Sequence, residues 1–160
     1  MTAVLWINLE RRRDRRDWFE RENIRRLPEL NWCRIEAFDE PNPQLGCWKS
    51  HRLAWFTVAS SYFPWEIIME DDARLIGAPT EIQDGINYLS GTAEGEFNRG
   101  TWAYALTPIT ATRLIRSFPS PVLPVDHALW NHPVAKHVFK PPLAEHCEVG
   151  PSDCKRHYER

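Results

Sequence analysis

Two short segments of the chain are apolar at nearly every position, and they constrain the fold more than any other feature. Residues 3–8 (Ala-Val-Leu-Trp-Ile-Asn) are too continuously apolar for an edge strand with one solvated face, and residues 65–69 form a second such strand candidate. Helical patterns follow both segments after short connections. Alternating strands and helices with short connections predict an α/β sandwich around a mostly parallel sheet.

The other predicted elements come from apolar spacing and from residues that start or stop helices. Thr107 suits a helix N-cap with Pro108 in the first helical position, and Pro28 ends an arginine-rich helix. The stretch 90–100 contains three glycines and no periodic pattern, which indicates a loop. In full, the sequence predicts strands at 32–38 and 101–106 and helices at 13–27, 46–61, 79–89, 108–117 and 126–131.

Length and composition indicate a globular domain. The 160 residues are 42% hydrophobic and 26% charged, and a domain of this size buries roughly 70% of its unfolded surface. The mean hydropathy is -0.51, and no apolar run approaches the roughly 20 residues of a membrane span. The first residues lack the basic segment of a signal peptide. We therefore expect one cytoplasmic, soluble domain over 1–160.

Arginines are concentrated near the start of the chain. Eight of them fall within the first 26 residues, together with five acidic residues. A solvated helix face accounts for most of this charge, and a site for an anionic phosphate needs only one or two of the arginines. Binding to nucleic acid is a weaker hypothesis, because the net charge is -2 and the isoelectric point is near 6.3.

Three consecutive acids follow the apolar strand at 65–69. Glu70, Asp71 and Asp72 are thereby placed at the carboxyl edge of the sheet, where open α/β folds bind ligands. Adjacent carboxylates repel one another, and a divalent cation with a preference for oxygen ligands relieves that repulsion. The pattern therefore indicates either a Mn²⁺ or Mg²⁺ site beside a phosphorylated ligand, or a solvated acidic turn.

Five segments in order resemble the family 25 glycosyltransferases. They are Val4-Leu5-Trp6-Ile7-Asn8-Leu9-Glu10-Arg11 with Arg15, Gly46-Cys47-Trp48-Lys49-Ser50-His51, Glu70-Asp71-Asp72, Gly100-Thr101-Trp102-Ala103-Tyr104 with Ala111 and Leu114, and Pro124-Val125-Asp126. The third is similar to the family's metal-binding acidic motif. Each segment is weak alone, and their shared order carries the resemblance.

The resemblance implies a GT-A fold, a Rossmann-related α/β/α sandwich in a compact version. It also implies a metal-dependent, inverting transfer of a sugar, often galactose, from a UDP-sugar to a glycan or lipid-linked glycan acceptor in lipopolysaccharide or lipooligosaccharide synthesis. On this view residues 1–75 hold the nucleotide and 100–160 face the acceptor. Contact with nucleic acid is not expected, and contact with a membrane would be peripheral at most.

The site residues are assigned on the same basis. Glu70 and Asp72, two positions apart, are the predicted metal ligands on one face of the strand. Asp126 is the predicted catalytic base, with a helix N-cap as the alternative. His146 could complete the metal shell, and Tyr104 is expected to pack in the sheet. The donor-binding residues are predicted to be Asn8, Arg11, Arg15, Ser50, His51 and Asp71.

Two other functions stay open at this stage. A shortened transferase-like module could bind nucleotide or carbohydrate without turnover, and the arginine-rich helix could bind nucleic acid. The four cysteines are scattered without a CxxC pair, so free thiols are expected.

Overall fold

A computed structural model describes residues 2–90, 101–151 and 153. Its main sheet has six strands, in spatial order β2 (Asn31–Glu36), β1 (Ala3–Asn8), β3 (Glu66–Glu70), β6 (Ala103–Leu106), β5 (Ile86–Tyr88) and β7 (Lys136–Val138). The helices are α1 (Arg13–Phe19), the π-helical turn η1 (Glu20–Ile24), α2 (Pro43–Ala59), α3 (Pro108–Ser117) and α4 (Val125–Asn131). A two-stranded sheet pairs β4 (Ala73–Leu75) with β8 (Ala144–His146).

The main sheet is mixed, and most of its strands run in one direction. The pairs β1–β2, β1–β3 and β5–β7 are parallel, whereas β6 runs antiparallel to both β3 and β5. The predicted α/β class with a mostly parallel sheet is confirmed. The chain passes from β1 to β2 on one side and then returns to β3 on the other side of β1. The strand order therefore reverses between β1 and β3.

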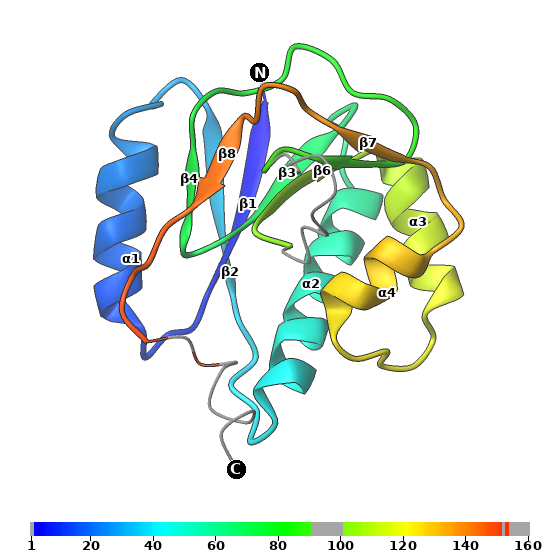
Figure 1. Ribbon diagram of the computed structural model, residues 1–160, viewed down its shortest axis with the longest axis horizontal. Helices are drawn as coiled ribbons and strands as arrows, with labels where there is room; N and C mark the ends of the chain where they lie inside the picture. The colour runs from blue at the N-terminus through cyan, green and yellow to red at the C-terminus, as the bar shows by residue number, and fades with distance from the viewer. Residues whose placement is uncertain (1, 91–100, 152, 154–160) are drawn as a thin grey trace.

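The two faces of the sheet carry separate hydrophobic cores. Ile67 and Met69 of β3 point to the face covered by α1, η1 and the small β4–β8 sheet. Ile68, between them in sequence, points to the face covered by α2, α3 and α4. Figure 1 shows these two helical layers on opposite sides of the sheet. Both faces are buried, which explains the continuous apolar runs at residues 3–7 of β1 and 67–69 of β3.

The predicted helix at 79–89 is wrong. This segment contains strand β5, whose three residues are all buried between β6 and β7. Gly85, just before β5, has a φ of 132°, which a helix does not accommodate, and a Cβ there would meet the Ala135 carbonyl oxygen at 2.4 Å. Close contact with a distant part of the chain thus overrides the weak local helical pattern. Of the predicted loop at 90–100, residues 91–100 lie outside the described part of the chain.

The other predicted elements are present with small shifts of boundary, whereas strands β4, β7 and β8 were not predicted from the sequence. Helix α2 begins at Pro43 because the Asn42 side chain accepts hydrogen bonds from the backbone of Gln44 and Leu45. The predicted Thr107 cap and Pro108 start of α3 are confirmed. No helix in the described ranges is both long and apolar enough to cross a membrane.

A hydrogen bond from Phe38 to Ser50 and a close backbone approach at Gly46 hold the segment after β2 against the first turns of α2. The Ser50 hydroxyl donates to the Gly46 carbonyl (2.7 Å) and accepts from the backbone N–H of Phe38 (2.9 Å). Gly46 lies so close to this segment that a Cβ would meet the Phe38 carbonyl oxygen at 2.4 Å. The position of residues 37–39 therefore depends on the absence of a side chain at Gly46.

We expect Gly46→Ala to lower the free energy of unfolding by about 1–3 kcal/mol, because the clashing partner is backbone and must move. Gly77→Ala is the matched control, since a Cβ at Gly77 meets no atom within 4 Å. Urea denaturation of both variants measures the difference. An equal effect of the two substitutions would contradict the close approach at Gly46.

Candidate functional site

The point where the strand order reverses carries a buried polar bridge. Asn8 ends β1 and Asp71 follows β3, and the Asn8 amide donates to the Asp71 carboxylate over 2.7 Å. Both residues are buried. In open α/β sheets ligands bind outside the carboxyl ends of the strands at such a reversal. The topology thus places the predicted acidic residues at the location where this fold class forms its ligand sites.

Arg15 forms ion pairs with both carboxylates at this point. Its Nη1 lies 2.7 Å from Asp71 Oδ1 and 3.0 Å from Asp72 Oδ2, and all three side chains are about nine-tenths buried. Burial nevertheless raises the pKa of Asp71 to about 6, against the opposing effects of Arg15 and Asn8. Asn8 and Arg15, predicted as donor-binding residues, are therefore first of all the groups that position Asp71 and Asp72.

Glu70 lies on the opposite face of the sheet from this cluster. Strand β3 ends at Glu70 and a turn follows, so the alternation of side chains does not continue to Asp72. The Glu70 carboxylate accepts a hydrogen bond from Thr101 and lies 3.3 Å from His51 Nε2. Glu70 and Asp72 therefore have different neighbours, contrary to the premise that they share one strand face.

His51 belongs to a buried network on the α2 side. Its Nδ1 lies 2.8 Å from the Tyr104 hydroxyl, which also accepts from the Trp55 indole N–H at 2.9 Å. Tyr104 is fully buried, and burial raises the pKa of its phenol well above its ordinary value. The prediction that Tyr104 packs in the sheet is confirmed. His51 Nε2 has no hydrogen-bond partner in the described part of the chain.

Two groups of side chains at this edge could hold a metal ion. One atom each from Cys47, His51 and Glu70 lies within 4.8 Å of the others. On the other face, Asp72 Oδ1 is buried and lacks a hydrogen-bond partner among the described residues, and His146 Nε2 lies 3.6 Å from Asp72 Oδ2. A buried carboxylate oxygen without a donor fits a cation ligand.

Asp126 lies in the first turn of α4. Helix α4 begins at Val125 with Pro124 in the cap position, so the alternative that Asp126 is an N-cap is wrong. Its carboxylate accepts from the His127 backbone N–H at 2.9 Å. Burial raises the pKa of Asp126, and the negative charge of Glu70 adds to the increase. A raised pKa brings a carboxylate closer to the range where it acts as a base at neutral pH.

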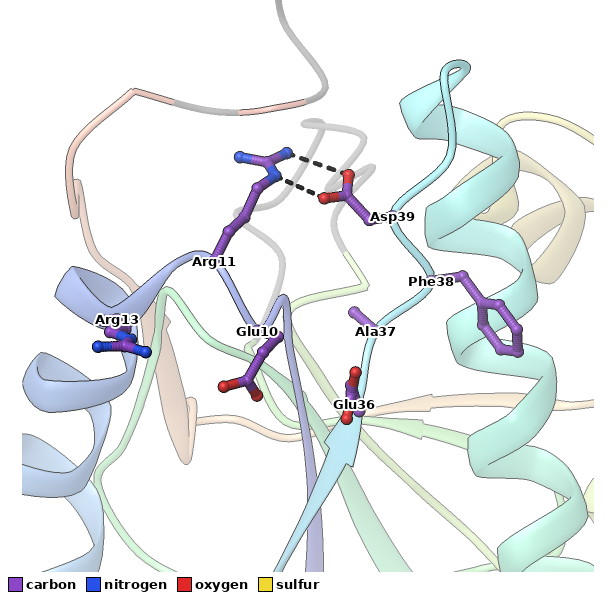
Figure 2. A pocket seen from close by; sticks show the side chains of 7 residues that line it. All are labelled: Glu10, Arg11, Arg13, Glu36, Ala37, Phe38 and Asp39. Atoms are coloured by element: carbon purple, nitrogen blue, oxygen red, sulfur yellow. Dashed lines mark hydrogen bonds and ion pairs between the residues drawn. The ribbon is translucent and has the colours of Figure 1, made fainter.

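An open pocket of about 610 Å³ lies at the carboxyl ends of β1 and β2. Arg11 and Asp39 face each other across it, with Arg11 Nε 2.7 Å from an Asp39 oxygen, and Glu36 lies at the end of β2 (Figure 2). The pocket is lined by Glu10, Arg11, Arg13, Glu36, Ala37, Phe38 and Asp39.

The segment at 149–153, after β8, contacts the arginines at the end of β1 and the start of α1. Arg11 and Arg12 both form ion pairs with Asp153, at 3.0 and 2.7 Å. Arg12 and Arg15 also donate to the carbonyl of Val149. The exposed Arg11 and the buried Arg12 and Arg15 therefore all contact the segment at 149–153.

The remaining predicted residues occupy different positions relative to the pocket. Arg11 lines it, and His51 lies in the α2 network. Ser50 is buried and binds the backbone of Phe38, behind the pocket wall. Sequence reasoning missed Asp39, although this acid follows the end of β2 by three residues; a polar residue soon after a parallel strand is a signal that could have found it. It also missed the grouping of Cys47 with His51 and Glu70, because the sequence shows only the helical spacing of Cys47 and His51.

Comparison with known proteins identifies the fold. No protein-family model matches the sequence, and a search of curated protein sequences finds no significant match. Among solved structures, the chain is similar to a glycosyltransferase involved in glycosylation of the major capsid of PBCV-1, with a TM-score of 0.62 and 11% identity over 94% of both chains.

Two further solved structures share this fold. One is a mutant of Drosophila β1,4-galactosyltransferase 7 in complex with manganese, UDP-Gal and xylobiose (TM-score 0.51, 8% identity, 71% of this chain and 51% of that one). The other is the glycosyltransferase GlyE of Streptococcus pneumoniae (TM-score 0.51, 10% identity, 87% of this chain and 45% of that one). The chain thus has the fold of GT-A glycosyltransferases and spans about half the length of these two structures.

Removal of Arg15 should destabilise the protein, because it leaves two buried carboxylates without their cation. We expect Arg15→Ala to lower the free energy of unfolding by about 3–5 kcal/mol near pH 7.5. The pKa of Asp71, about 6, exceeds its unfolded value of 3.8, so Asp71 lowers stability as the pH rises through 6. Without Arg15 the stability lost when Asp71 ionises is larger. The difference in free energy of unfolding between Arg15→Ala and the unsubstituted protein should therefore be smaller near pH 4.5, below the pKa of Asp71 in the folded state.

Denaturant unfolding at both pH values measures this effect, with Arg13→Ala as the control because Arg13 is exposed on the same helix. A loss of stability that is equal at both pH values would show that the carboxylates are not the source of the effect.

Proposed function

We propose that the protein is a glycosyltransferase that moves a sugar, galactose in the first instance, from a UDP-sugar to a glycan or lipid-linked glycan acceptor. The observation that carries this proposal is the acidic turn after β3 at the strand-order reversal of a GT-A fold, together with an open pocket at the ends of the neighbouring strands β1 and β2. The segments that resemble family 25 glycosyltransferases favour an acceptor in lipopolysaccharide or lipooligosaccharide synthesis.

The pocket at the ends of β1 and β2 is the proposed nucleotide site. Arg11 is half exposed there and suits the diphosphate, since guanidinium groups form strong charge-assisted hydrogen bonds with phosphate oxygens. Asp39 and Glu36 offer carboxylate oxygens that can accept from ribose hydroxyls. Binding of the diphosphate would require Arg11 to exchange its present ion pairs with Asp39 and Asp153.

Asp72 is the residue best placed to hold a Mn²⁺ or Mg²⁺ ion beside the diphosphate. Its Oδ1 is buried without a donor among the residues that the structure describes, and His146 Nε2, 3.6 Å from Asp72 Oδ2, is a further ligand candidate. Such ions are commonly held by one or two carboxylates together with phosphate oxygens. When bound, the ion would neutralise charge on the leaving UDP. Glu70 as a second ligand stays a prediction, since its carboxylate lies toward His51.

Asp126 is the proposed base. In an inverting transfer its carboxylate takes the proton of the acceptor hydroxyl while that oxygen bonds to the anomeric carbon. The bond from the anomeric carbon to the UDP oxygen breaks at the same time, and UDP leaves with that electron pair. The partial burial of Asp126 and its raised pKa suit this role at neutral pH.

Metal dependence is tested with Asp72→Asn. In the unsubstituted protein, UDP at about 100 times its dissociation constant with Mn²⁺ should stabilise the fold by roughly 2.7 kcal/mol. We expect the manganese-dependent part of this stabilisation to disappear in Asp72→Asn and to persist in Asp17→Asn, an exposed control on α1. Thermal unfolding with UDP, with and without Mn²⁺, measures it. Full manganese-dependent stabilisation in Asp72→Asn would remove Asp72 from the site.

Catalysis is tested with Asp126→Asn, which keeps the side-chain shape and removes the basic oxygen. Turnover of UDP-galactose should fall by about 10²–10⁴, the usual contribution of a positioned base, while UDP binding stays unchanged. Release of UDP in the presence of a glycan acceptor measures turnover, and Asp17→Asn again serves as the control. Normal turnover in Asp126→Asn would place the base elsewhere. Saturable UDP binding without turnover in the unsubstituted protein would favour a binding module.

A further inference from the structure

A cysteine, a histidine and a glutamate converge on the α2 side of the sheet, away from Asp72. We propose that Cys47, His51 and Glu70 form a second metal site, selective for a thiophilic divalent cation such as Zn²⁺. The ligand atoms of the three residues lie within 4.8 Å of one another. This inference does not rest on the proposed transferase activity, because it concerns binding of the metal alone.

The placement of the three residues follows from regular structure. Cys47 and His51 are four residues apart in α2, and residues at this spacing lie one turn apart on the same face of a helix. Glu70 is the last residue of β3 and points toward α2. A rigid helix and a central strand therefore supply all three ligands, which favours a fixed geometry.

The orientation of His51 leaves one ring nitrogen for a metal. Its Nδ1 contacts the Tyr104 hydroxyl, while Nε2 is buried, faces Glu70 and has no hydrogen-bond partner in the ranges described. Histidine ligands commonly donate the N–H of the other nitrogen to a nearby oxygen, which fixes the tautomer and the ring plane. Tyr104, held in turn by Trp55, supplies that oxygen.

The separations suit a tetrahedral zinc ion. With Zn–N and Zn–O near 2.0–2.1 Å and Zn–S near 2.3 Å, neighbouring ligand atoms lie about 3.3–3.6 Å apart. The His51 Nε2 to Glu70 Oε1 distance is 3.3 Å, and the largest separation within the group, at most 4.8 Å, needs only a modest adjustment of side chains.

The donor types determine which metal is preferred. A thiolate and an imidazole favour zinc over manganese or magnesium, whereas the carboxylate of Asp72 on the other face favours the harder ions. Thiolate and carboxylate together carry a charge of -2, which balances a divalent cation in this half-buried location. Glu70 is about one quarter exposed, so an ion could enter past it and keep water in a fourth position.

Cobalt(II) is the probe, because thiolate ligation to cobalt gives a charge-transfer band in the near ultraviolet. We expect the unsubstituted protein to show this band at one equivalent of cobalt, and one equivalent of Zn²⁺ to abolish it. Cys47→Ser should eliminate the band, and His51→Gln should weaken cobalt binding by about tenfold or more. Cys33→Ser, which alters an exposed cysteine on β2, should retain it.

Three outcomes would overturn the proposal. The first is absence of the band in the unsubstituted protein, and the second is persistence of the band in Cys47→Ser. The third is loss of the band in Cys147→Ser, which would place the thiolate ligand beside Asp72 instead. The first requires no variant, so a folding defect cannot hide it. Asp72→Asn should keep the band while it loses the manganese effect on UDP binding, so failure of this inference and failure of the proposed function can be told apart.

Discussion

The interaction on which the rest of the site depends is the buried contact of Arg15 with Asp71 and Asp72. Two carboxylates in a dry location at the end of a strand repel each other, and their burial is costly unless a cation is held against them. Arg15 meets this requirement from α1, and Asn8 adds a hydrogen bond from the neighbouring strand. Through its contact with Val149 the same arginine also fixes the segment that follows β8. The helix, the reversal point of the sheet and the end of the described chain are therefore joined by one side chain.

The end of β3 separates two kinds of chemistry. Within the strand, side chains alternate between the two hydrophobic cores, so Glu70 faces α2 and α4 while Asp71 faces α1. Three adjacent acids are thereby divided between an arginine-bound, oxygen-rich face and a face with a thiol, an imidazole and a phenol. Asp126 is close enough to the second face for the charge of Glu70 to contribute to its raised pKa. The proposed site for the Mn²⁺ or Mg²⁺ ion at Asp72 thus lies on the first face, whereas the proposed base and the proposed zinc ligands belong to the second.

Sequence reasoning succeeded where local signals and tertiary packing agree. The apolar runs of β1 and β3 needed burial on both faces, and the cap at Thr107 specified the start of α3. It failed at 79–89, where the contact between Gly85 and Ala135 and the pairing of β5 with two strands distant in sequence decided the structure. It also extended the alternation of β3 past Glu70, although a turn begins there, and so placed Glu70 and Asp72 on one face.

The sequence by itself determined the α/β class and the presence of acidic residues at a strand end, because both depend on neighbours along the chain. The same local information located Asp126 near a helix start and Arg15 within the first helix. Only the tertiary structure decided which groups meet. Arg15 is 56 residues from Asp71, His51 is 53 from Tyr104, and Arg12 is 141 from Asp153. Such contacts depend on the order of strands and on which face each side chain takes, and spacing along the chain encodes neither.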